Sequence, residues 1–214
     1  VQFCVQVDRQ EEVQPSGKAI GLDVGLHDFY TDSNNRTVDN PRFLRTGERR
    51  LKQAQRLVSR RAKGSRNRAK ARVILGKRHL KISRQRKDWA VKLARCVIRS
   101  NDLVAYEDLR IKNMVKNHCL AKSINDASWY QFRLWVESLG KVYGKITIAV
   151  PSNGTSQECS RCGTVVKKTL STRTHVCQCG CVLDRDHNAA RNILSRGLAT
   201  VGHTGSYGLD PCNA

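Results

Sequence analysis

Five of the nine cysteines in this 214-residue sequence lie between residues 159 and 181, and their spacing constrains the fold more than any other feature. Cys159 and Cys162 form a C-x-x-C-G knuckle, in which two thiolates can reach one ion and the following glycine can adopt the positive φ that the turn needs. The next cysteine, Cys177, follows after fourteen residues, enough for a hairpin whose returning strand is predicted at 170–176. This pattern indicates a zinc ribbon with a closed, structural site.

The second group of cysteines, CQCGC, holds one thiol more than a tetrahedral zinc site needs. Because Cys179 precedes a glycine, as Cys162 does, we favour Cys179 as the partner of Cys177. Cys181 is then the spare, although a pair made by Cys177 and Cys181 stays open as the alternative. His175 could also supply a ligand, and a set of reduced structural cysteines without metal is the remaining interpretation.

Positive charge is concentrated in one segment. The formal net charge is +21, and residues 42–99 hold 22 Lys and Arg against two acids, whereas the rest of the chain holds 17 against 16. A nearly neutral body with a basic arm predicts a nucleic-acid partner, because each neutralised phosphate releases counterions. A solvated helical face is the alternative. The residues expected to contact nucleic acid are Arg49, Arg50, Arg56, Arg60, Arg61, Lys63, Arg66, Arg68, Arg84, Arg86 and Lys87. The predicted ribbon also carries basic residues, which could contact backbone phosphate or could only make the ribbon soluble, and the sequence favours neither. These residues are Arg161, Lys167, Lys168 and Arg173.

The composition argues against a membrane protein. The longest apolar run, at 146–150, is far too short to span a bilayer. No secretory signal is visible at the start of the chain, which begins with Val1 and is interpreted here as a fragment. We therefore expect a cytoplasmic protein.

Apolar periodicity predicts a mixed α/β sheet with two insertions rather than a doubly wound sheet, which would alternate strands and helices more evenly. Asn125 or Asp126 should cap the helix at 126–143, and Gly144 should end it. The expected elements are a strand hairpin at 18–25 and 26–35, basic helices at 48–100 with a break near Gly64 and a second candidate break at Gly76, a central strand at 101–109, the helix at 126–143, a strand at 145–150, the cysteine module at 151–185 and a helix at 188–198.

Three carboxylates are embedded in otherwise apolar elements, where a charge is costly unless a metal or hydrogen bonds compensate it. They are Asp23, Glu107 and Asp186. If the strands are neighbours, the three converge at one edge of the sheet, where two Mg²⁺ ions held by shared carboxylates could activate a water molecule. Taken singly, each could be a turn residue, a strand-end acid or a helix cap. Asp108 and Asp184 are competitors that periodicity does not separate from Glu107 and Asp186.

The motifs GLDVG (21–25), YEDL (106–109) and DRDHNAARNI (184–193) resemble the three RuvC-type motifs of the TnpB proteins. These are transposon-encoded, RNA-guided nucleases related to the type V CRISPR effectors. The resemblance covers roughly residues 15–205, and it includes the segments SRQRKDWAVKLAR (83–95), SINDASWYQF (123–132) and PSNGTSQECSRCG (151–163).

The resemblance implies an RNase H-like fold with a zinc ribbon inserted before the final helix. It implies that Asp23, Glu107 and Asp186 are the catalytic acids, since the family's D-x-N pattern favours Asp186 over Asp184. It also implies DNA as substrate and a guide RNA as partner. Because so few residues separate Gly180 from Arg185, we expect the ribbon to help fix the direction in which the Asp186 side chain points.

The family pattern also divides the chain. The expected parts are a remnant of an N-terminal wedge-type domain (1–17), three RuvC-like parts (18–47, 101–150 and 184–198), a basic helical insertion (48–100), a zinc ribbon (151–183) and a flexible tail (199–214). Family members read the guide RNA and the target-adjacent motif with regions that precede the first RuvC motif, so we expect a missing N-terminal region or a separate polypeptide.

Two functions follow from these features. The first is a magnesium-dependent DNA endonuclease of a transposon, described in older terms as a transposase. The alternative is a truncated transposon protein that binds DNA or RNA without catalysis. A junction resolvase of the same fold is a weaker third possibility, because such an enzyme does not need a zinc ribbon between its last two motifs.

Overall fold

The structure is a computed structural model that describes residues 9–169 and 171–202. Residues 1–8, which belong to the expected remnant of a wedge-type domain, lie outside the described residues. So do the tail beyond residue 202 and Leu170, the first residue of the predicted ribbon strand. Within the described part, no helix is long and apolar enough to cross a membrane.

The main sheet is mixed and has the strand order β3-β2-β1-β4-β5, while β6 and β7 pair separately. The strands are β1 (Ala19–Val24), β2 (Asp28–Asp32), β3 (Thr37–Asp39), β4 (Leu103–Glu107), β5 (Ile146–Val150), β6 (Thr174–Val176) and β7 (Val182–Asp184). The helices are α1 (Phe43–Arg60), α2 (Arg66–Ser100), α3 (Ile111–Met114), α4 (His118–Ala127), α5 (Trp129–Val142) and α6 (Arg185–Thr200). The predicted class, a mixed α/β sheet with two insertions, is confirmed.

The pairing of the strands brings the ends of β1 and β4 together. β1 is antiparallel to β2, which confirms the predicted hairpin, and it is parallel to β4 with Leu22 opposite Tyr106. β4 is in turn parallel to β5. Because parallel strands end at the same edge, the residues that follow Leu22 and Tyr106 lie beside each other there.

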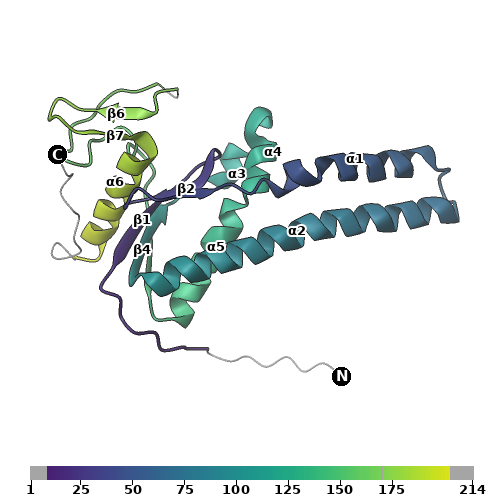
Figure 1. The fold of residues 1–214 in the computed structure, drawn as a ribbon, viewed down its shortest axis with the longest axis horizontal. Coiled ribbons are helices and arrows are strands. Elements are labelled where there is room, and N and C mark those ends of the chain that lie inside the picture. The colour runs from purple at the N-terminus through teal and green to yellow at the C-terminus, as the bar shows by residue number, and fades with distance from the viewer. Residues whose placement is uncertain (1–8, 170, 203–214) are drawn as a thin grey trace.

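The two faces of the sheet are covered by different helices, because successive side chains of a strand point to opposite faces. Leu22 and Tyr106 belong to the main core, which the sheet forms with α2 and α5. Leu103 and Ala105 pack with Ile193 of α6 in a second cluster. Figure 1 shows α6 and α5 on opposite sides of the sheet.

The helix α6 approaches β1 so closely that one strand position must be glycine. A Cβ atom on Gly21 would lie 2.2 Å from the carbonyl oxygen of Ala190 and 2.9 Å from the Cβ of Leu194. Both contacts are shorter than those that real Cβ atoms make. The glycine of GLDVG therefore sets the distance between α6 and the strand that carries Asp23.

An aromatic cluster joins the hairpin to the helices on the opposite face. The ring of Phe29, which is fully buried, meets Trp89 of α2 edge-on at 4.4 Å and Phe132 of α5 edge-on at 5.2 Å between centroids. Such pairs contribute roughly 0.5–1.5 kcal/mol each beyond the burial of their area. The cluster ties β2, α2 and α5 into one core.

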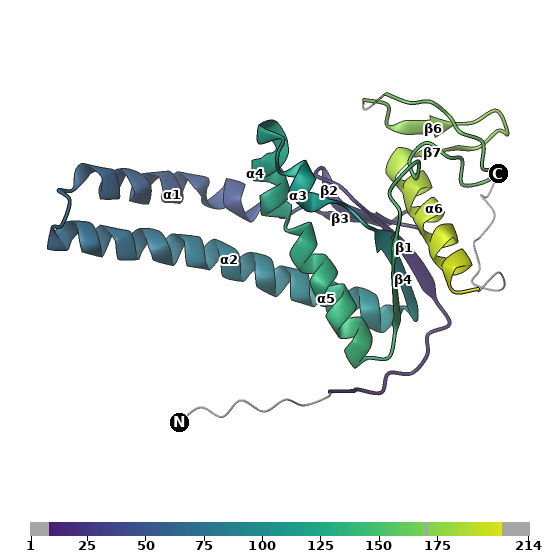
Figure 2. The ribbon, with the colours of Figure 1, turned by 180° about the vertical axis from the view of Figure 1, so that it is seen from behind.

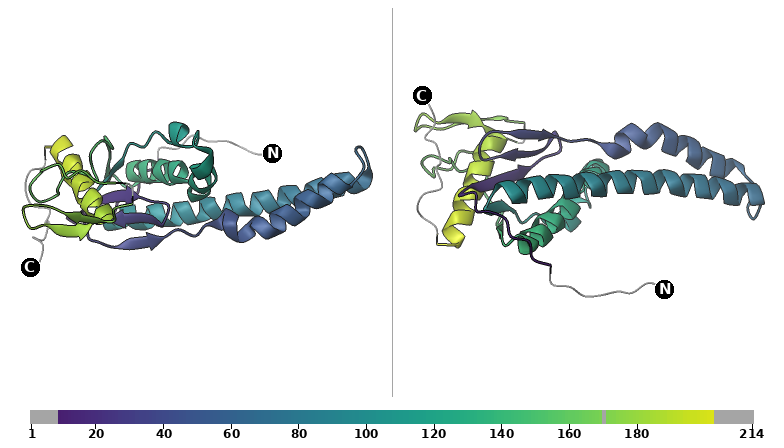
Figure 3. Two further views of the ribbon diagram at one scale, coloured as in Figure 1. Left: turned by 90° about the horizontal axis from the view of Figure 1, so that it is seen from above. Right: turned by 60° about the horizontal axis from the view of Figure 1, so that its bottom comes forward.

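The basic segment forms a long helical hairpin that projects from the body (Figure 2), and Figure 3 shows α1 lying along the outer part of α2. The chain breaks between Arg60 and Arg66, as predicted near Gly64, but it does not break at Gly76, where α2 continues as one helix of 35 residues. A single solvated glycine costs a helix only about 1 kcal/mol, which the flanking helix-forming residues offset.

The helix predicted at 126–143 is in fact the end of α4 followed by α5, and the predicted caps Asn125 and Asp126 are wrong. Ser128 has a left-handed backbone (φ 58°) and separates the two helices. The helix α5 ends before Gly144, as predicted. Periodicity missed the break, because the apolar face of α5 continues the phase of Ile124 in α4.

Asp126 caps a different helix. Its carboxylate, 8% exposed, accepts hydrogen bonds from the Leu44 backbone N–H at 2.8 and 3.0 Å, and so satisfies the first turn of α1. It also accepts from Arg86, with Nη2 at 2.7 Å. This buried ion pair ties the base of the basic hairpin to the body.

Candidate functional site

The carboxylates of Asp23 and Glu107 lie on the α6 face at the C-terminal edge of the sheet. Asp23 alternates with Gly21, which contacts α6, and Glu107 alternates with Ala105, which packs against α6. The register of β1 and β4 places the two acids on neighbouring strands at equivalent positions. The convergence predicted from the strand ends is therefore present for these two residues.

Asp186 stands in the first turn of α6, and the structure separates it from its competitor. The side chain of Asp184 accepts from the backbone N–H of Asp186 at 2.8 Å and of His187 at 3.2 Å, so Asp184 is the cap of α6. The carboxylate of Asp186 is free of that task. At the other motif, Asp108 is largely exposed and pairs with Arg133.

The electrostatics of the three acids show that they share one region. Burial raises the pKa of Asp23 well above its usual value, and the nearby charges of Glu107 and Asp186 raise it further. Burial also raises the pKa of Glu107, against the opposing effects of a hydrogen bond from Thr155 and the charge of Arg196. Carboxylates crowded in this way are stabilised by a cation, and their oxygen atoms suit Mg²⁺.

The three acids do not form a closed cluster in this structure. Throughout residues 9–169 and 171–202, the only group of three or more His, Cys, Asp or Glu ligand atoms within 4.8 Å of one another consists of cysteines. Asp186 is instead turned toward two arginines, with Nε of Arg185 at 2.9 Å and Nη1 of Arg173 at 3.3 Å. Arg173 precedes β6 in the ribbon, so the ribbon does contact the Asp186 side chain, as expected.

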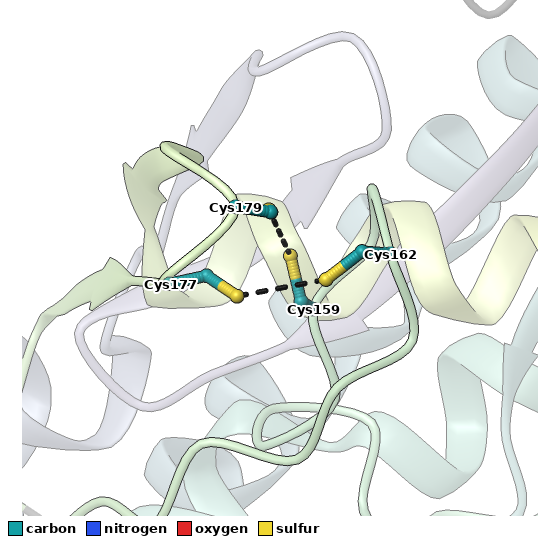
Figure 4. A group of neighbouring side chains, drawn as sticks. All are labelled: Cys159, Cys162, Cys177 and Cys179. Carbon is teal, nitrogen blue, oxygen red and sulfur yellow. Dashed lines mark hydrogen bonds between the residues drawn. The ribbon is translucent and has the colours of Figure 1, made fainter.

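The cysteine group consists of Cys159, Cys162, Cys177 and Cys179, whose sulfur atoms all lie within 4.8 Å of one another. Figure 4 shows the four side chains converging on one point. The Sγ–Sγ distance is 3.7 Å between Cys159 and Cys179 and 3.6 Å between Cys162 and Cys177. Gly163, which follows the first knuckle, has the positive φ that the spacing predicted. Four convergent thiols are the donor set of a structural zinc site.

Thr164 prepares one of these thiols for metal. Hydrogen bonds between Cys162 and the side chain and backbone of Thr164 lower the pKa of Cys162 to about 6, which favours the thiolate that a zinc ion needs. The preference for the anion is thus built into the first knuckle by the residue that follows its glycine.

Cys181 and His175 lie outside the sulfur group. Cys181 is 3% exposed and packs in the small ribbon core. His175 is fully buried, with Nδ1 at 2.5 Å from Nζ of Lys168, and Lys168 also donates to the Ser156 carbonyl oxygen at 2.8 Å. Lys168 is therefore engaged inside the ribbon rather than available to a phosphate.

A row of polar side chains on α6, missed by the sequence analysis, holds the segment that enters the ribbon. Asn188, Asn192 and Arg196 recur every four residues and so share one helical face. Asn192 Nδ2 donates to the carbonyl oxygens of Thr155 at 2.8 Å and of Glu158 at 2.7 Å. Asn188 Nδ2 also donates to Glu158 at 2.8 Å. The signal was present as the spacing N-x-x-x-N-x-x-x-R, which begins in the last motif and ends just after it.

Arg196 completes this row. Its Nη1 donates to the carbonyl oxygens of Pro151 and Asn153, both at 2.8 Å, and its Nη2 pairs with Glu158 at 2.8 Å. We call Asn188, Asn192 and Arg196 the α6 clamp. The clamp fixes the start of the ribbon on the helix that carries Asp186.

The predicted nucleic-acid residues differ in their surroundings. All of them are exposed except Arg68 and Arg86, which are half-buried. Arg86 forms a salt bridge with Asp126, and Nζ of Lys87 lies 5.8 Å from the centre of the Trp135 ring. The acids of this segment lie near the body, where Glu48 pairs with Lys52. The distal part of the hairpin contains no acid.

Two family models match the chain. The OrfB_IS605 model, described as "Probable transposase", matches residues 2–118, and the model described as "Cas12f1-like, TNB domain" matches residues 129–193. The first match covers more than half of the chain, and the second covers the helix before the ribbon, the ribbon and the start of α6.

Individual relatives agree with these models. A Streptomyces pristinaespiralis protein named "Putative RNA-guided DNA endonuclease" is 42% identical over 186 residues, which cover 85% of this chain and 46% of the relative. An Escherichia coli (strain K12) protein named "Putative RNA-guided DNA endonuclease InsQ" is 31% identical over 206 residues, which cover 88% of this chain and 51% of the relative. The chain thus spans about half the length of these relatives.

One solved structure shares the fold. A chain in the "Cryo-EM structure of the Cas12f1-sgRNA-target DNA complex" superposes with a TM-score of 0.58 at 18% identity, and the match covers 85% of this chain and 50% of that chain. At this identity the likeness concerns the arrangement of the elements.

Proposed function

Because the chain belongs to the OrfB (TnpB) family of transposon proteins, we propose that it is the catalytic part of a metal-dependent, RNA-guided DNA endonuclease with an RNase H-like fold. The observation that carries this proposal is the meeting of Asp23 and Glu107 at one edge of the sheet, with Asp186 close enough to raise the pKa of Asp23. Crowding of the carboxylates of Asp23 and Glu107 does not stabilise the fold, since like charges repel.

The three acids would hold one or two Mg²⁺ ions, which supply a nucleophilic water and stabilise the leaving oxygen of a phosphodiester. Asp23 and Glu107 are held rigidly by strands, and Asp186 by the first turn of α6. Binding would require Asp186 to exchange its contacts with Arg173 and Arg185 for the metal. Arg173 would then be released beside the substrate phosphate.

The hairpin of α1 and α2 would bind the nucleic acid. Its exposed cations are uncompensated beyond the acids near the body, and α1 is about 27 Å long at 1.5 Å per residue. That length matches roughly eight phosphates along one strand of a duplex. The hairpin would therefore supply much of the affinity and none of the chemistry.

The ribbon would bind one zinc ion through Cys159, Cys162, Cys177 and Cys179. All four positions of the ion would be taken by protein, so the role of zinc would be structural.

The test is a cleavage assay on single-stranded DNA with the purified chain and Mg²⁺, which compares wild type with Asp23→Asn. We expect Asp23→Asn to reduce the rate by at least a hundredfold. Asp108→Asn, which removes the exposed neighbour of Glu107, is the matched control and should keep the wild-type rate. Measurable cleavage at equal rates by wild type and Asp23→Asn would refute the proposed catalytic site.

The second candidate, a non-catalytic nucleic-acid-binding protein, is favoured by the uncompensated charge of the hairpin alone. It predicts salt-sensitive binding of DNA or RNA without turnover under either Mg²⁺ or Mn²⁺. Such binding, together with the absence of turnover under both metals, would favour this second function.

A further inference from the structure

Thr155 lies at the point where the ribbon meets the proposed catalytic acids. The residue is 3% exposed, and its hydroxyl lies 2.5 Å from Oε1 of Glu107 and 3.2 Å from the Ser152 carbonyl oxygen. A hydroxyl has one proton to donate. The carboxylate is both the nearer and the more strongly charged acceptor, so the proton is directed to Glu107.

The position of Thr155 is itself fixed from α6. Its carbonyl oxygen accepts from Asn192, and the segment on either side is bound by the rest of the α6 clamp, at Pro151 and Asn153 before it and at Glu158 after it. The hydroxyl is therefore held by a backbone that has few alternative positions. A group that is fixed in this way can orient a ligand that it contacts.

We propose that Thr155 is a positioning residue, which orients the Glu107 carboxylate for metal binding and is held in place by the α6 clamp. The inference rests on the proposed function of Glu107 as a metal ligand. The inference assigns a role to the threonine of the motif PSNGTSQECSRCG and to the two asparagines of DRDHNAARNI. The proposed chemistry by itself gives these three residues no role.

The chemistry of the contact explains why a hydroxyl is needed. Burial raises the pKa of Glu107, and the hydrogen bond from Thr155 opposes this rise because it favours the ionised carboxylate. Glu107 has two oxygens, and the hydroxyl occupies Oε1. The other oxygen is then left for the metal in a defined direction.

The experiment compares Thr155→Val, which keeps the shape but removes the donor, with Thr155→Ser, which keeps the donor. Two measurements are independent of cleavage: Mn²⁺ affinity by calorimetry, and the Glu107 pKa by NMR of ¹³C-labelled glutamate, assigned by its absence from Glu107→Gln. We expect Thr155→Val to weaken Mn²⁺ binding by about 10- to 100-fold. It should also move the Glu107 titration and the acid limb of the pH–rate profile to higher pH. Thr155→Ser should retain values near wild type.

The matched control is Thr200→Val, since the Thr200 hydroxyl is exposed and binds only a carbonyl of its own helix at 2.9 Å. It should change none of these quantities. Zinc content and the melting temperature show whether each variant is folded. If Thr155→Val does not fold, Thr155→Ala, which removes the same donor without adding bulk, replaces it.

The outcomes separate this inference from the function on which it rests. If Glu107→Gln binds Mn²⁺ and cleaves as wild type does, the proposed metal site is wrong. If Glu107→Gln loses Mn²⁺ binding while a folded Thr155→Val keeps the wild-type affinity, Glu107 titration and pH profile, the site stands and the role of Thr155 is overturned. A Thr155→Ser variant that is as weak as Thr155→Val would also overturn it.

Discussion

The C-terminal edge of the sheet, on its α6 face, and the basic hairpin carry charges of opposite sign and arrange them differently. At the sheet edge, three acids are crowded on a rigid frame whose other polar groups are satisfied by the α6 clamp and by the Asp184 cap. On the hairpin, cations spread over exposed helices and have no acid near them beyond the body. This difference is why we propose partners of opposite charge and of different kind, a compact cation at the sheet edge and an extended polyanion on the hairpin.

The two regions also differ in how they are attached to the body. The sheet edge is continuous with the core, whereas the hairpin depends on its base, where Asp126 binds both the start of α1 and Arg86. The ribbon is a third case, because its core is small and its four thiols stand in place of a hydrophobic interior.

Removal of zinc should have the largest effect, and it should be confined to the ribbon and the acids beside it. Structural zinc contributes about 10–16 kcal/mol of apparent binding energy in zinc-finger peptides. We expect one zinc per chain by elemental analysis, and loss of that zinc in Cys179→Ser. Cys181→Ser is the control and should keep it. A zinc-free Cys181→Ser protein beside a zinc-loaded Cys179→Ser protein would show that the ligand set is wrong.

Substitution of Asp126 should destabilise the attachment of the hairpin. Asp126→Ala leaves the half-buried Arg86 unpaired and the Leu44 N–H without an acceptor, and breaking such a pair costs about 3–5 kcal/mol. Urea unfolding measures the loss of free energy. The control is Asp88→Ala, since Asp88 and Lys92 form an exposed pair whose loss should cost less than about 0.5 kcal/mol.

Removal of hairpin charge should weaken DNA binding without changing stability. If Arg56, Arg60 and Arg66 each neutralise a phosphate, replacing all three with Gln should make the negative slope of log K against log salt less steep by about 2.7. The factor by which the variant binds more weakly than wild type should then be about 40 times larger at 50 mM salt than at 200 mM salt. Fluorescence anisotropy at several salt concentrations gives the slope. The same number of charges removed from the body, at Lys18, Lys112 and Lys116, should leave it unchanged; an equal fall for both variants would argue against the hairpin as the binding surface.

The pH dependence of stability should show the crowding at the sheet edge. The pKa of Asp23 is raised in the folded state, so the folded chain binds more protons than the unfolded chain once the pH exceeds about 4. Its unfolding free energy should therefore fall as the pH rises toward the folded pKa, by about 1.4 kcal/mol for each unit by which that pKa is raised.

This measurement is made on the zinc-loaded chain without Mg²⁺, by urea unfolding at several pH values. Asp23→Asn should remove the fall and should be more stable than wild type at neutral pH. The Asp108 carboxylate is exposed, so Asp108→Asn should show the same fall in unfolding free energy as wild type. A fall of the same size in Asp23→Asn would mean that other groups are responsible.

Local patterns predicted much of the fold. The hairpin of β1 and β2, the strand β4, the end of α5 at Gly144 and the apolar face of α6 all follow from residues that are close in sequence, and the structure confirms them. The family resemblance, read from three short motifs, is confirmed by the family models. Predictions failed at Gly76 and Ser128, because one glycine does not break a long helix and because two helices joined by one residue share a phase.

The sequence by itself determined which residues could do chemistry: the cysteines by their spacing, the acids by their apolar surroundings and the hairpin by its charge. Only the tertiary structure decided between neighbours in the chain. It made Asp184 a helix cap, directed Asp108 to Arg133, engaged Arg86 with Asp126 and brought Thr155 to Glu107. The physical reason is that the type of a side chain limits what it can bind, whereas its partner is set by strand register and helix packing, which bring together residues far apart in the sequence.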